Sequence, residues 1–216
     1  MPCNHKFIEN LNLENLDFEP EVLIVGTFNP AWPETNQAQW FYGRTQNNYF
    51  WDVLPALYQQ PALRNLLADE MPVIWKMFCR KHKIAITDLI RSVSDADELN
   101  GEHHTLLGNY SDSNIANRFN DFALTDVISL LRQHPSIKSV YLTTKAQIPF
   151  FNEIWIAIEN YCVEKGIHSR RLLTPSGSAR YQIPVGYVPQ FPVFNGVLAN
   201  YILENWHQEW HEQNLV

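Results

Sequence analysis

The chain has 216 residues, of which 45% are hydrophobic and 13% aromatic, so it can bury one sizeable core, and we expect a single domain over residues 1–216. Twenty-three acidic against sixteen basic side chains give a formal charge of −7, which disfavours nucleic-acid binding through bulk electrostatics and requires any DNA contact to be a local patch. No run reaches the roughly 18 apolar residues of a membrane span, and Met1 to Asn15 is too polar for a signal-peptide core. The three cysteines lie far apart, which suits reduced thiols. We therefore expect a cytoplasmic protein.

Four short apolar segments predict buried β-strands. The first, Glu21 to Val25, ends at Gly26 and an Asn-Pro step, which holds the following loop extended. The other three segments also end at polar loops, and they are Lys83 to Thr87, Lys138 to Leu142 and Arg170 to Leu173.

Helical periodicity lies between and after these strands. The predicted helices cover Tyr49 to Tyr58, Asn114 to Gln133, Phe150 to Lys165 and Phe194 to Gln213, and the polar stretch from Ser92 to Tyr110 is expected to be a long loop. Alternating strands and helices predict an α/β fold, a three-layer α/β/α sandwich with a central, mainly parallel four-stranded sheet.

Ligands of an open parallel sheet bind beyond the carboxyl ends of its strands. Four polar loops should therefore meet at one edge of the predicted sheet. They are Gly26 to Pro30, Asp88 to Arg91, Thr143 to Lys145 and Thr174 to Arg180.

Two of these loops carry recognisable motifs. Gly26-Thr27-Phe28-Asn29-Pro30 is followed by the aromatic-glycine pair Tyr42-Gly43 and then by Asn48-Tyr49-Phe50-Trp51, which opens a helix. This order resembles the first motif of the uracil-DNA glycosylase superfamily, and within it the mismatch-specific and hypoxanthine-DNA glycosylase branches. Thr174 to Arg180 resembles the second motif, the Asn-Pro-Ser-Gly-x-Ser-Arg loop of the mismatch-specific enzymes. The resemblance covers roughly residues 20–182 and leaves out the predicted C-terminal helix.

The resemblance implies a metal-independent DNA glycosylase without a cofactor, acting on DNA that holds a damaged or mismatched base. Such an enzyme flips the base out of the duplex and hydrolyses its N-glycosidic bond, and uracil and hypoxanthine are the expected targets. No membrane or protein partner is expected.

The chemistry of this reaction requires a positioned water near the sugar and hydrogen-bond donors around the departing base. By their match to the first motif, Asn29 and Asn48 are the candidate catalytic residues, because an amide can orient water although it cannot ionise. Alternatively, Asn29 caps the turn before Pro30, and Asn48 is the N-cap of the helix that it opens.

The remaining candidate residues would hold the base or the DNA backbone. Tyr42, or failing that Phe41, would stack on the flipped base, and small residues of the second motif suit a phosphate. The expected substrate-binding residues are Gly26, Thr27, Phe28, Tyr42 and Thr174, and the expected DNA-binding residues are Lys145, Ser176, Gly177 and Arg180. A local basic patch is available in the acid-poor segment that contains Lys138, Lys145, Lys165, Arg170, Arg171 and Arg180.

Two departures from the family pattern leave other functions open. Thr174 stands where related enzymes carry Asn or His, and Arg44-Thr45 replaces the usual His-Pro. A catalytically inactive nucleic-acid-binding module, or a small-molecule hydrolase of the same fold, would also fit. His207 and His211 share the spacing of a metal site on a helix, but without a third ligand they are expected to be solvated.

Overall fold

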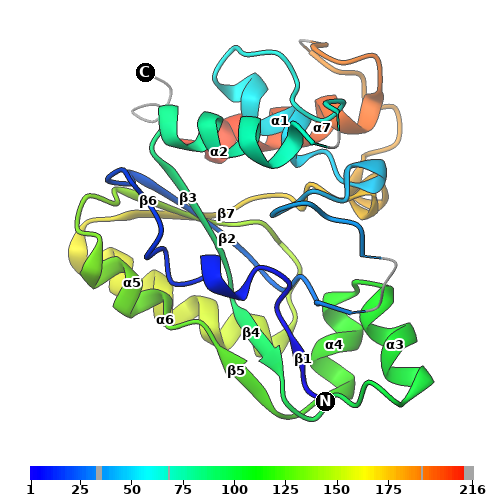
Figure 1. Cartoon of the computed structure of the whole chain (residues 1–216). Helices are drawn as coiled ribbons and strands as arrows, with labels where there is room; N and C mark the ends of the chain where they lie inside the picture. Colours follow the sequence, from blue (N-terminus) through cyan, green and yellow to red (C-terminus); the bar gives the residue numbers. More distant parts are fainter. Residues whose placement is uncertain (33–35, 68, 191, 212–216) are drawn as a thin grey trace.

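The computed structural model describes residues 1–32, 36–67, 69–190 and 192–211. Its centre is a parallel four-stranded sheet in the order β3-β2-β6-β7 (Figure 1). The strands are β2 (Val22–Gly26), β3 (Ile84–Asp88), β6 (Ser139–Leu142) and β7 (His168–Arg171). The four predicted strands and the parallel sheet are confirmed.

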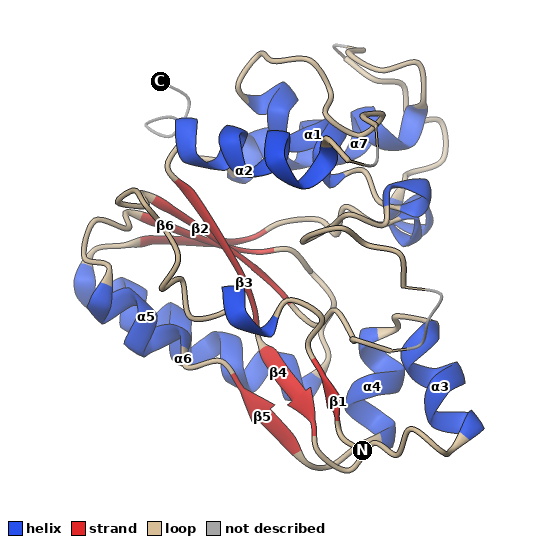
Figure 2. Ribbon diagram, viewed as in Figure 1, coloured by secondary structure: helices blue, strands red, loops and turns tan. Residues whose placement is uncertain are grey.

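Helices cover both faces of this sheet (Figure 2). One face carries α1 (Phe50–Leu57), α2 (Met71–Lys81) and α7 (Val197–Glu209), and the other carries α5 (Val127–Gln133) and α6 (Pro149–Lys165). The buried strand β2 contributes side chains to the cores on both faces of the sheet, because successive side chains of a strand point to opposite faces. Val22 and Ile24 belong to the core beneath α1, and Leu23 and Val25 to the core above α6. The predicted three-layer sandwich is therefore confirmed.

A second, antiparallel sheet extends the molecule beyond the end of β3. It has the order β1-β4-β5, from β1 (Cys3–Asn4), β4 (Ile90–Val93) and β5 (Phe122–Leu124). The short helices α3 (Gly101–Gly108) and α4 (Asp112–Arg118) lie beside it (Figure 1), and the loops contain 3₁₀ turns η1 (Ile8–Asn10), η2 (Thr45–Asn47) and η3 (Gly177–Gln182). This sheet brings the N-terminal residues to the edge where the central strands end.

The structure corrects the prediction of one helix over Asn114 to Gln133. That stretch forms α4, β5 and α5, because two polar residues interrupt the helical pattern. The Asn120 N–H donates to the Asp95 carboxylate at 2.8 Å, and Asp126 caps α5 by accepting from the Ser129 N–H at 2.9 Å.

Other boundaries also differ from the predictions. The stretch 92–110 is not one long loop, because it contains the end of β4 and all of α3. Helix α2 was not predicted, since only Trp75, Phe78 and Cys79 of its eleven residues are buried. Helix α7 begins three residues later than expected, and Gln213 lies outside the described residues. No described helix has the length and apolar character of a membrane span.

Candidate functional site

The carboxyl ends of the central strands open onto a cavity of 530 Å³. All four loops that were expected to meet contribute to its wall, as the topology of a parallel sheet requires. Residues from α4 and from the turn before it close another side. The lining includes Gly26, Thr27, Phe28, Asn29, Tyr42, Arg44, Asn48, Asp88, Asp112, Thr143, Lys145, Thr174, Ser176 and Tyr181.

Backbone hydrogen bonds join the two sequence motifs at this cavity. Asn48 and Ser176 form an antiparallel β-bridge, and the Tyr49 N–H donates to the Pro175 carbonyl at 2.7 Å. Next to the bridge, a Cβ added at Gly177 would lie 1.9 Å from the Asn47 Oδ1, so the two segments are in close contact there as well. The motifs therefore form one wall of the cavity although they lie far apart in the sequence.

The Asn48 side chain lies at the end of this bridge and is 8% exposed. Its Oδ1 accepts from the Phe50 N–H at 2.9 Å, which satisfies a free donor of the first turn of α1. Among the described residues, none accepts a hydrogen bond from its Nδ2. The N-cap of α1 is Tyr49 and not Asn48, so Asn48 supports the first turn from one residue before the cap. Its Nδ2 is the group that it can offer to a ligand.

The Asn29 amide is also held by its neighbours. Its Oδ1 accepts from the Asn36 Nδ2 at 2.6 Å, and that same Nδ2 donates to the Pro30 carbonyl at 2.7 Å. The backbone carbonyl of Asn29 accepts from the Lys6 N–H at 2.8 Å. Asn36 therefore orients the side-chain amide and Lys6 fixes the backbone, which suits a residue that positions water.

Tyr42 has a strained backbone and a fixed ring. Its φ of 57° lies in the left-handed region that non-glycine residues seldom adopt. The ring stacks on Phe50, with centroids 3.8 Å apart and planes 3° from parallel, so a base could use only the other face. Phe50 and Trp51 are fully buried, as expected for core residues.

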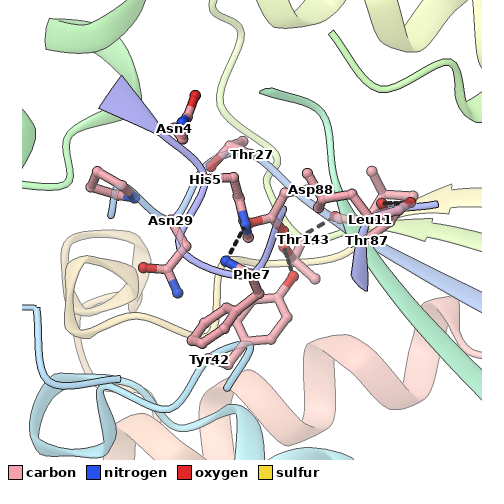
Figure 3. Close-up of polar contacts among 12 residues, drawn as sticks. Asn4, His5, Phe7, Leu11, Thr27, Asn29, Tyr42, Thr87, Asp88 and Thr143 are labelled. Carbon is pink, nitrogen blue, oxygen red and sulfur yellow. Dashed lines mark hydrogen bonds and ion pairs between the residues drawn. The ribbon is translucent and has the colours of Figure 1, made fainter. Parts of the chain in front are cut away.

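The hydroxyl of Tyr42 points to the loop after β6 (Figure 3). It lies 2.8 Å from the Thr143 Oγ1, which itself donates to the Val25 carbonyl at 3.3 Å. Because Thr143 has one hydroxyl hydrogen, Tyr42 is the donor in this pair. Burial, reinforced by nearby Asp88, raises the pKa of Tyr42 well above its ordinary value, so the hydroxyl keeps its proton.

Asp88, which lines the cavity, belongs to a buried pair that the sequence did not indicate. The His5 Nε2 lies 2.7 Å from the Asp88 Oδ2, and the two side chains are 0% and 7% exposed (Figure 3). Asp88 belongs to an expected loop, but His5 lies before the region that resembles the glycosylases. In the sequence, His5 is a single histidine two residues before Phe7 in a segment of mixed polarity. Such a pattern is too weak to predict a role for this residue.

Asp112 and Arg44 occupy another part of the wall. The Thr27 hydroxyl donates to Asp112 Oδ1 at 2.6 Å, and the Arg44 guanidinium carbon lies 3.4 Å from the centroid of the Tyr110 ring. Burial raises the pKa of Asp112 to about 6, an effect that the Thr27 hydrogen bond partly offsets and nearby Asp88 increases. The first motif thus contributes both a cation and the partner of a carboxyl group.

The second motif forms a chain of hydroxyl groups. The Thr174 and Ser176 hydroxyls lie 3.2 Å apart, those of Ser176 and Ser178 lie 2.6 Å apart, and the Ser178 N–H donates to the Ser176 hydroxyl at 3.4 Å. Arg180 is exposed on η3, and its Nε donates to the Gly177 carbonyl at 2.7 Å. Arg180 does not line the cavity itself, but Ser178 and Tyr181 on the same turn do.

The expected basic patch is largely neutralised. Four of its six cations pair with carboxylates, because Lys138 contacts Glu21, Lys165 contacts Glu164, and Lys145 and Arg170 both contact Glu209. Lys145 lines the cavity, but its Nζ lies 2.8 Å from the Glu209 carboxylate. Arg171 and Arg180 are the two patch residues without a carboxylate partner in the described part of the chain.

The paired histidines near the C-terminus do not share a helix face. Helix α7 ends at Glu209, so His211 lies beyond it, and its ring contacts that of His168 with centroids 4.9 Å apart. No cluster of three metal-ligating side chains is found among the residues that the structure describes.

Comparisons with known proteins bear on the fold. No protein-family model matches the chain, and no curated protein matches it. Among solved structures, it is similar to the solution NMR structure of a Methanosarcina acetivorans protein that is provisionally described as a uracil DNA glycosylase. The two chains share one fold. The match has a TM-score of 0.51 at 14% sequence identity and covers 91% of this chain and 94% of the other.

Proposed function

We propose that this protein is a DNA glycosylase of the uracil-DNA glycosylase superfamily, formed by one domain over residues 1–216, which removes uracil or hypoxanthine from DNA. The β-bridge between Asn48 and Ser176 is the observation that carries this proposal. It joins two motifs that resemble those of the superfamily at the mouth of one cavity, in a fold shared with a protein described as a glycosylase. The cavity volume of 530 Å³ falls within the range of about 300–1,000 Å³ that is typical of small-ligand sites.

In the proposed reaction, a flipped base enters the cavity and lies against the free face of Tyr42. Asn29 and Asn48 hold a water molecule near the sugar. Cleavage of the N-glycosidic bond leaves negative charge on the base and positive charge on the sugar. Water then adds its oxygen to the sugar carbon and releases a proton, which balances the proton that the departing base anion takes up. The half-buried guanidinium of Arg44 faces the same cavity and would stabilise the negative charge of the departing base.

The second motif would bind the DNA backbone. The hydroxyl groups and backbone N–H groups around Ser176 and Gly177 suit a phosphate, since the small residues allow close approach. Arg180 extends from the same turn and would neutralise one phosphate. Because most cations of the expected patch are paired, this contact would carry much of the attraction to DNA.

The proposal is tested with oligonucleotides that each hold one uracil, hypoxanthine, xanthine or mismatched base. After incubation with excess protein, alkali cleaves the strand at every abasic site. Breaks at the uracil or hypoxanthine position are expected, and unmodified DNA is the control. Binding without breaks at any lesion would contradict the proposal and would indicate an inactive binding module, whereas neither binding nor breaks would favour a small-molecule hydrolase.

A further inference from the structure

The hydrogen bonds around His5 determine which of its nitrogens carries a proton. The Phe7 N–H donates to His5 Nδ1 at 2.9 Å, so Nδ1 is an acceptor without a hydrogen (Figure 3). In the resulting tautomer Nε2 carries the hydrogen and donates it to Asp88 Oδ2 at 2.7 Å. His5 therefore acts as a directed donor whose orientation is set by the backbone of its own segment.

The other carboxylate oxygen of Asp88 is left for the cavity. Oδ1 lies beside Gly26, where an added Cβ would be 2.1 Å away, and near the Tyr42 hydroxyl. Tyr42 cannot donate to it, because its proton goes to Thr143. No described residue donates a hydrogen bond to Oδ1, although Asp88 is 5% exposed and lines the cavity. Oδ1 is therefore an acceptor on the cavity wall, available to water or to a ligand that displaces the water.

We infer that the His5-Asp88 pair is a specificity element, which selects a flipped base whose pairing-edge ring nitrogen carries a hydrogen and rejects one whose ring nitrogen carries a lone pair. The inference rests on the proposed function. An ionised carboxylate only accepts hydrogen bonds. It would accept from N3–H of uracil or N1–H of hypoxanthine, and it would repel the lone pair on N3 of cytosine or N1 of adenine.

An acceptor at this position recognises the hydrogen that deamination adds to the ring nitrogen of the base. Replacing the amino group by a carbonyl moves a hydrogen onto the adjacent ring nitrogen, in a pyrimidine and in a purine alike. One acceptor could therefore serve both lesions without contacting the carbonyl group. His5 is a positioning residue in this account, because it contacts Asp88 and not the base.

The substitution Asp88→Asn gives a sharp test because His5 would fix the orientation of the new amide. The His5 Nε2–H needs an acceptor, so the amide oxygen at position 88 would face His5 and the NH₂ group would face the cavity. The variant would then present a donor where the native protein presents an acceptor. It should bind cytosine relatively better and uracil relatively worse, and the preference between them should shift by about 10- to 100-fold.

Two kinds of oligonucleotide separate this inference from the proposed function. Cleavable duplexes holding uracil or cytosine report hydrolysis, and duplexes with the same bases on 2′-fluoro sugars, which resist cleavage, report binding. The remote variant Asp17→Asn is the matched control, because Asp17 forms an exposed ion pair with Arg80 far from the base site. Thermal melting of every variant verifies folding.

The role of His5 is tested in the Asp88→Asn background. Adding His5→Phe keeps a flat ring among Phe7, Phe28 and Phe41 but removes the donor, so the amide at position 88 can rotate. The double variant should lose most of its preference between uracil and cytosine. His5→Gln in place of His5→Phe restores a donor and should restore the preference of Asp88→Asn, which a purely structural role of His5 would not predict.

The outcomes are distinct. A uracil preference that Asp88→Asn reduces or reverses, but Asp17→Asn does not, supports the inference. If the preference between uracil and cytosine is unchanged in Asp88→Asn, the inference about Asp88 is overturned. Cleavage of uracil-containing DNA would then still support the proposed glycosylase activity. If nothing is cleaved but binding to the 2′-fluoro duplexes still depends on Asp88, the proposed hydrolysis fails and base selection stands. If the protein shows no cleavage and no preference between the bases, both the inference and the proposed function are overturned.

Discussion

The Asp88 carboxylate occupies the space beside Gly26 that a side chain at that position would need, with Oδ1 only 2.1 Å from the site of an added Cβ. The two residues are register partners at the ends of the neighbouring strands β2 and β3. Absence of a side chain at position 26 therefore allows a hydrogen-bonded carboxylate to reach the cavity.

The first prediction concerns this contact. Gly26→Ala should destabilise the protein by about 1–3 kcal/mol, because Asp88 is buried and tied to His5 and cannot move away cheaply. Gly177→Ala is a matched control with a small cost, within about 0.5 kcal/mol, since the Asn47 side chain that it meets is exposed and can rotate. Urea unfolding measures both. Equal losses for the two variants would contradict this account of Gly26.

A second prediction separates the two roles of Asn48. Asn48→Asp keeps an oxygen for the Phe50 N–H, so the free energy of unfolding should stay within about 1 kcal/mol of the native value. The same change removes the Nδ2 donor and should reduce the single-turnover rate by about 10²-fold or more. If the rate stays native while Asn48→Ala loses stability, Asn48 only supports the first turn of α1.

A third prediction addresses Arg180. Arg180→Ala should weaken DNA binding and reduce the slope of log affinity against log salt by about one, because one phosphate contact is lost. The cleavage rate at saturating protein should be largely preserved, since Arg180 does not line the cavity. Lysine at the same position should recover most of the slope. Lost cleavage with unchanged affinity would refute the phosphate contact.

A fourth prediction follows from Asp112, whose pKa is raised from 3.8 to about 6. Between pH 4 and 6 the folded protein binds a proton at Asp112 more tightly than the unfolded chain does. This group therefore makes the protein less stable as pH rises through that window. Asp112→Asn removes the effect and keeps an acceptor for Thr27, so its stability relative to the native protein should increase from about pH 4 to about pH 6 and then level off.

Urea unfolding at several pH values measures this difference. About two pKa units set an upper limit near 3 kcal/mol at pH 7. A stability difference between the native protein and Asp112→Asn that does not change across this pH range would contradict the shifted pKa.

The central strands could be predicted because each is a continuous apolar run that ends at a glycine or polar residue. The convergence of four loops then followed from the topology of a parallel sheet. The break between α4 and α5 could not be predicted from the sequence. It depends on the hydrogen bond from the Asn120 N–H to Asp95, which lies 25 residues away in the sequence. The apolar spacing of this stretch alone suits one long helix.

Two features of the site depend on contacts between distant segments. The pairing of Lys145 with Glu209 spans 64 residues, and that of His5 with Asp88 spans 83. Local sequence patterns carry no information about such pairs. For this reason the basic segment suggested a free cationic patch, and the N-terminal histidine gave no sign of a role.

The most direct measurement is the release of free base from uracil-containing or hypoxanthine-containing DNA, followed by mass spectrometry with protein in excess. We expect one molecule of free base for each abasic site, and a chelator should not change this yield. We also expect that Asn29→Ala lowers the rate by about 10²–10³-fold while DNA affinity changes little. Binding of the lesion duplex without any free base, or an Asn29→Ala variant as fast as the native protein, would contradict the proposed mechanism.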